Sequence, residues 1–141
     1  MPTSTAYTFR ATISLPIEQT RARVEAALTA EGFGVLTEID VAATLKAKLG
    51  LVRPPYLILG ACNPGLANAA IELEPSIGAL LPCNVVIRQA EDTTETIVEI
   101  LDPEAALGIA ASEQIAPIAV EAAARLRRVL ASVAADKRAT R

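Results

Sequence analysis

The sequence predicts an α+β fold, in which a mostly antiparallel sheet of about five strands is backed by two main helices. Apolar and polar residues alternate over Thr5–Leu15 and again over Thr94–Leu101, the period-two pattern of half-buried strands. The later strands are short and locally connected, which favours antiparallel pairing. Two longer segments, residues 17–31 and 113–137, carry apolar side chains at helical spacing and can cover one face of the sheet.

The first two strands and the helices after them are bounded by residues with strong local preferences. Pro16 suits the first turn of a helix, where its missing N–H is not needed, and Gly32 suits the left-handed residue at a helix end. Asp40 is a good N-cap, and Gly50 ends the helix that it starts. We therefore expect a strand over Thr5–Leu15, a helix to about Glu31, a strand over Phe33–Ile39 and a short helix over Val41–Leu49.

The second half of the chain contains three more strands and two more helices. Tyr56–Ala61 is a continuous apolar run, typical of a buried strand. Asn63 followed by Pro64 is a strong helix start, and Pro75 ends that helix. Pro117 has to lie in the first turn of the last helix, because a proline further inside would kink it. We expect the remaining strands over Cys83–Gln89 and Thr94–Leu101, joined by a polar turn at residues 91–93, and a long helix over residues 113–137.

The composition argues against several classes of function. The chain has no histidine, so a Ser-His-Asp or Cys-His catalytic unit cannot form within one copy, and the commonest transition-metal ligand is missing. The net charge is −3, and only 3% of the residues are aromatic. Nucleic acids need a basic face and rings for stacking, so we expect no nucleic-acid partner.

We expect residues 1–141 to form one soluble, cytoplasmic domain. Neither an internal repeat nor a linker divides the chain. The first residues lack the basic start and apolar core of a secretory signal, and no run of about 18 apolar residues predicts a membrane span. In the cytoplasm the two cysteines would be reduced thiols.

The candidate site lies at two places where a cysteine precedes an asparagine. Cys62 and Asn63 end one predicted strand, while Cys83 and Asn84 begin the next. If these strands are antiparallel neighbours, the two cysteines meet at one end of the sheet. Cys62 also precedes a helix N-terminus, which favours negative charge. Glu38, near the end of the preceding strand, is a further candidate for the same rim.

Packing and capping also explain these residues, because free cysteine is often a buried apolar side chain. Three functions remain open. The first is a homodimeric binding or accessory domain for a small molecule, an anion or a soft metal, with Cys62 and Cys83 as the candidate metal ligands. The second is a thiol-dependent redox or sulfur-handling enzyme, which needs both sulfurs within disulfide reach. The third is a structural or interaction protein without a small-molecule site. Two thiols are too few for a closed zinc site, which needs four ligands, unless a dimer or the carboxylates complete it, and the sequence leaves the cofactor unknown.

Four stretches resemble the family called domain of unknown function 302: GFGVLTEIDV from Gly32, TLKAKLG from Thr44, YLILGACNP from Tyr56, and EPSIGALLPCNVVI from Glu74. The resemblance covers about residues 5–103 and is weaker in the C-terminal helix. It implies a β-α-β-β-β-β-α arrangement similar to the TATA-binding-protein-like fold, and a homodimer. It implies no activity.

Overall fold

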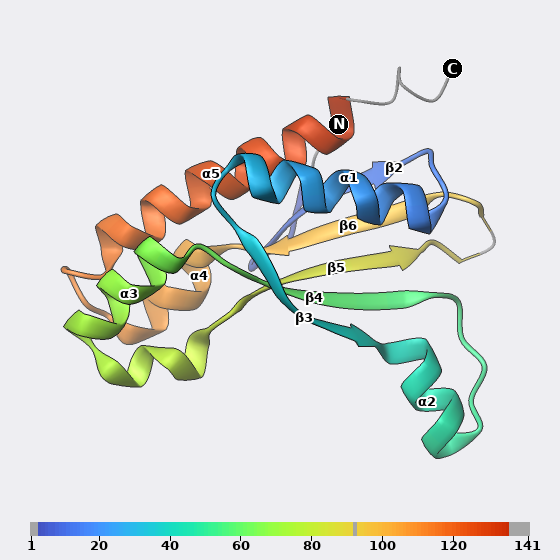
Figure 1. The fold of residues 1–141 in the computed structure, drawn as a ribbon, viewed down its shortest axis with the longest axis horizontal. Helices are drawn as coiled ribbons and strands as arrows, with labels where there is room; N and C mark the ends of the chain where they lie inside the picture. Colours follow the sequence, from blue (N-terminus) through green and yellow to red (C-terminus); the bar gives the residue numbers. More distant parts are fainter. Residues whose placement is uncertain (1–2, 92, 136–141) are drawn as a thin grey trace.

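A computed structural model describes residues 3–91 and 93–135. The described residues form one antiparallel sheet of six strands in the order β1-β2-β6-β5-β4-β3 (Figure 1). This confirms the predicted sheet and adds the two-residue β1 at one edge. The strands are β1 Thr3–Ser4, β2 Thr8–Ile13, β3 Gly34–Asp40, β4 Tyr56–Cys62, β5 Cys83–Gln89 and β6 Thr96–Leu101.

The helices cover one face and one end of this sheet. α1 and α5 lie side by side over one face, α3 and α4 gather at one end, and α2 projects from the other end (Figure 1). Two main helices therefore back the sheet, as predicted; the last two residues of the predicted C-terminal helix lie outside the described range. The helices are α1 Ile17–Ala30, α2 Val41–Leu49, α3 Pro64–Leu73, the 3-10 turn η1 Pro75–Leu80, α4 Pro103–Leu107, the 3-10 turn η2 Gly108–Ala110 and α5 Ala116–Ala135.

The core lies between the sheet and the α1–α5 pair. Alternate side chains of the central strands, among them Leu59, Val85 and Ile100, are fully buried, and they face buried residues such as Leu28 of α1 and Leu126 of α5. Burial of these side chains supplies the main driving force for folding. The intervening side chains of β2, β4, β5 and β6 stand on the opposite face, which no described helix covers (Figure 1).

The sequence pattern of the second strand predicts that Phe33, Val35, Thr37 and Ile39 share one face, and this prediction is wrong beyond Val35. Val35 pairs with Ala61 and packs against the core, but the register shifts between Val35 and Thr37. The extra residue of such a bulge moves the following side chains to the opposite face of the sheet. Ile39 therefore pairs with Ile58 on the open face and is 49% exposed.

The predicted helix boundaries follow from local chemistry. Asn63 Oδ1 accepts a hydrogen bond from Leu66 N at 3.1 Å, and Asp40 Oδ1 accepts one from Ala43 N at 2.9 Å. Gly50 ends α2 with a φ of +69°, in the left-handed region that glycine tolerates. Val41, Leu45 and Leu49 form an apolar stripe at a spacing of four residues along α2, but this stripe does not enter the core, since none of the residues of α2 is buried.

Replacing Gly60 with alanine should destabilise the protein by about 1–3 kcal/mol, because the new Cβ would overlap Thr37 Oγ1 and lie 2.9 Å from Pro82 Cγ. Urea denaturation measures this change in the free energy of unfolding. Gly34→Ala is the matched control, as a Cβ on this β3 glycine meets nothing within 4 Å. Equal stability of the two variants would contradict the close packing at Gly60.

Candidate functional site

The two cysteines lie at the end of the sheet where α3 and η1 connect β4 to β5. Cys62 is the last residue of β4, and Cys83 is the first residue of β5. Ala61 pairs with Cys83, so the cysteines are offset by one residue across an antiparallel pair. Both line one pocket, together with Asn63, and neither is in a disulfide. Its walls also include Phe33, Leu66, Pro82, Leu107, Ile118 and Ala122.

Close backbone packing positions this pocket beside the end of α1. Gly32 adopts a φ of +86°, and a Cβ on it would lie 3.0 Å from Asn63 Nδ2 and 3.3 Å from Arg125 Nη1. Arg125 Nη1 donates a hydrogen bond to the carbonyl oxygen of Glu31 at 3.1 Å. The end of α1, the start of α3 and the middle of α5 therefore meet at the wall of the pocket.

The pocket is small and almost wholly apolar. Its cavity volume is about 40 Å³, and Asn63 is the one polar amide in its lining. A water molecule occupies about 30 Å³ in the liquid. The pocket therefore accepts a small apolar group, such as the tip of a larger ligand, in this conformation.

Burial makes Cys83 a poor nucleophile. The side chain is 9% exposed, and desolvation, helped by the nearby Cys62 thiol, raises the pKa of Cys83 to about 11. A buried thiol resists ionisation because the thiolate loses its hydration. At neutral pH Cys83 is a protonated, apolar part of the wall.

The other two candidate residues lie elsewhere. Asn84 pairs with Gly60 and is exposed, outside the lining of the cysteine pocket. Glu38 stands further along β3, paired with Leu59, where it accepts hydrogen bonds from Arg21 of α1. The structure thus brings together Cys62, Asn63 and Cys83, and it separates them from Asn84 and Glu38.

Among the described residues, no group of three or more cysteine or acidic side chains is close enough to hold a metal ion. Within the same ranges, no helix has the length and apolar character needed to cross a bilayer.

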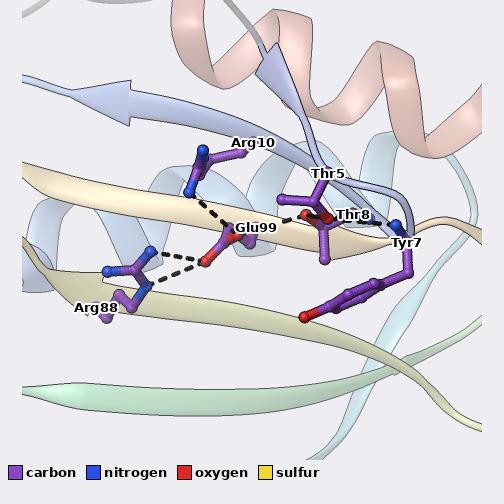
Figure 2. Close-up of polar contacts among 6 residues, drawn as sticks. All are labelled: Thr5, Tyr7, Thr8, Arg10, Arg88 and Glu99. Atoms are coloured by element: carbon purple, nitrogen blue, oxygen red, sulfur yellow. Dashed lines mark hydrogen bonds and ion pairs between the residues drawn. The ribbon is translucent and has the colours of Figure 1, made fainter.

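A second cluster of functional groups occupies the open face of the sheet, and the sequence analysis missed it. Figure 2 shows Arg10 and Arg88 reaching Glu99 from the two neighbouring strands, β2 and β5. Thr8 and Tyr7 lie on the same side of the sheet. The sequence feature that could have identified this cluster is the alternation of apolar and polar residues along the strands, because Arg10, Arg88 and Glu99 all occupy polar positions. Such positions are usually assigned to solvent.

Comparisons with known proteins identify a family. A family model described as a domain of unknown function, DUF302, matches residues 9–133. The crystal structure of an uncharacterized conserved protein DUF302 from Bacillus stearothermophilus is similar, with a TM-score of 0.82 and 29% sequence identity. The match covers 89% of this chain and 97% of that one. No curated protein matches the chain significantly.

Cys83 should react slowly with iodoacetamide in the folded protein. Raising the pKa from the ordinary 9.0 to about 11 lowers the thiolate population at neutral pH roughly 100-fold. Peptide mapping by mass spectrometry measures the alkylation rate, with the urea-unfolded chain as the control. The rate of folded Cys83 should rise with pH up to about 11. The raised pKa of Cys83 also stabilises the folded state below pH 9, and this contribution is lost as the pH rises through 11. A folded rate that levels off at the same pH as the unfolded one would contradict this assignment.

Proposed function

The chain belongs to the DUF302 family, and from this premise we propose that it is a homodimeric binding domain whose cysteine pocket receives a small apolar group of a ligand. The family name assigns no activity, so the proposal rests on the site. The observation that carries it is that Cys62 and Cys83, distant in sequence, line one apolar pocket.

The state of Cys83 supports a binding role over chemistry at the Cys83 thiol. A redox or sulfur-transfer enzyme needs a thiolate that is accessible at neutral pH. Cys83 is buried, and its raised pKa keeps it protonated. As wall residues, the two thiols contribute polarisable apolar surface, which suits a non-covalent ligand.

The homodimer part of the proposal rests on the β3–α2 surface, defined here by Leu36, Ile39, Leu49, Leu51 and Val52. All five side chains are large, apolar and exposed. β3 is also the edge strand of the sheet, so one side of its backbone has no strand partner among the described residues. An exposed apolar edge strand is a surface that proteins usually cover.

A second copy of the chain is the occupant that we propose for this surface. Two β3 edges related by a two-fold axis can pair antiparallel, with the same residues contributed by each copy. The exposed apolar side chains of both copies then become buried together, which is the main stabilising contribution at such an interface.

Filling the cysteine pocket should abolish binding of a small apolar probe. We expect xenon to shift the backbone amide NMR signals around the pocket in the wild type, because dry apolar cavities bind it. Ala67→Leu places three more carbons in the lining and should remove these shifts. Ala79→Leu, on an exposed residue of η1 outside the pocket, is the control and should leave them unchanged. Equal shifts in both variants would contradict the proposal.

Charged substitutions on β3 should dissociate the dimer. The double variant Leu36→Lys, Ile39→Lys should be monomeric in size-exclusion chromatography with light scattering, while the wild type is dimeric. Both side chains are exposed in the monomer, so folding should persist. Val120→Lys, which changes an exposed apolar residue of α5, is the control and should stay dimeric. A monomeric wild type would refute the homodimer.

A further inference from the structure

A second and larger pocket lies on the open face of the sheet. Its cavity volume is about 410 Å³, within the range of pockets that hold small molecules. Side chains of β2, β4, β5, β6 and the connection before β4 line it. The charged and aromatic groups in the lining are Arg10, Arg53, Arg88, Tyr7, Tyr56 and Glu99, with Glu91 also in the lining.

Glu99 holds two of the three arginines in place. Arg88 donates to Glu99 Oε1 from Nε at 3.1 Å and from Nη2 at 2.9 Å. Arg10 Nη1 lies 3.8 Å from Glu99 Oε2, and Thr8 Oγ1 donates to that oxygen at 3.4 Å. The Glu99 side chain is only 15% exposed, so this network is partly desolvated and its groups are restrained (Figure 2).

Positive charge exceeds negative charge in this pocket. Among the described lining residues, three guanidinium groups face two carboxylates, and Glu99 is already engaged by Arg88 and Arg10. Arg53 makes no ion pair with any described residue. An excess of arginine in a concave site favours an anionic ligand, particularly in a chain whose net charge is −3.

The neighbouring carboxylates do not form ion pairs with Arg53. Another hollow, in which Arg53 is also a lining residue, contains Glu18, Glu38 and Asp40. Glu38 is engaged by Arg21, and Asp40 accepts the N-terminal hydrogen bond of α2 from Ala43. Since no ion pair joins Arg53 to any of these three carboxylates, its guanidinium donors are available to a ligand.

Both tyrosines of the chain line the pocket. Tyr56 pairs directly with Arg88 across β4 and β5, so its side chain shares the open face. Tyr7 is 62% exposed, and its ring extends along the same side of the sheet (Figure 2). Phenol rings offer hydroxyl donors for an oxyanion and apolar faces for the body of an organic molecule.

We propose that this open-face pocket binds a small organic oxyanion, a molecule that carries a carboxylate or phosphate group. Arg53 and Arg10 contact the charged group, because both have guanidinium donors that no hydrogen bond within the described residues uses. Arg88, held by Glu99, adds positive potential from a restrained position. Planar guanidinium groups match the oxygen geometry of carboxylate and phosphate alike.

Tyrosine fluorescence can test the proposal without a label. The chain has two tyrosines and no tryptophan, so the signal reports on this pocket alone. We would titrate the full chain with inorganic phosphate and, separately, with acetate, holding ionic strength constant with sodium chloride. A saturable change with phosphate assigns the site to phosphate esters, and one with acetate assigns it to carboxylates.

Three variants separate a binding site from a structural ion pair. Arg53→Gln should weaken binding of the active probe roughly tenfold, because a charged hydrogen-bond donor is lost. Glu99→Gln should strengthen binding several-fold, because it removes a competing carboxylate and raises the local positive charge. Lys46→Gln, on exposed α2 outside the pocket, removes one charge as a control and should leave binding unchanged.

Either of two results would overturn the proposal. The first is a linear, unsaturable response of the folded wild type to both anions. The second is equal weakening by Arg53→Gln and Lys46→Gln, which would indicate general charge screening. Ala67→Leu should leave anion binding unchanged, so failure of the cysteine pocket and failure of this site are distinguishable. Circular dichroism of each variant confirms that it is folded.

Discussion

One-sided burial of the antiparallel sheet is the constraint on which the other features of the molecule depend. α1 and α5 cover one face, where Val85, Ile87 and Ile100 are fully excluded from water. Because side chains alternate strictly along a strand, each buried residue directs its neighbours to the opposite face. Arg88 and Glu99 are such neighbours. The open-face pocket is therefore a consequence of the same alternation of side chains that builds the core.

The two candidate sites differ in the interactions that hold them together. The cysteine pocket depends on close approach of backbones, since Gly32 leaves room for the side chains of Asn63 and Arg125. Its apolar lining disfavours any charged ligand, because the charge would lose its hydration. The open-face pocket depends on charge instead, with the Glu99 carboxylate restraining two guanidinium groups. The two proposals therefore concern chemically different groups.

The sequence predicted the features that depend on neighbours in the chain, and it failed where distant residues decide. Asp40 and Asn63 cap helices because their side chains reach the next turn, so local reasoning found both. The bulge in β3 follows from its pairing with β4, which no local pattern reveals. The convergence of Arg10, Arg53 and Arg88 likewise depends on strand order. The spacing of apolar residues in α2 indicated an amphipathic helix, but it could not indicate whether a core was available to bury those residues.

The repeated Cys-Asn pair illustrates why similarity in sequence need not mean similarity in structure. Cys62 and Asn63 stand at a strand-to-helix junction, where the asparagine caps α3 and both line the same pocket. Cys83 and Asn84 lie within a strand, so alternation sends them to opposite faces of the sheet. The second asparagine therefore cannot duplicate the role of the first. What unites the two cysteines is the antiparallel pairing of β4 and β5, and the argument for a site at this end rests on that pairing rather than on the repeat.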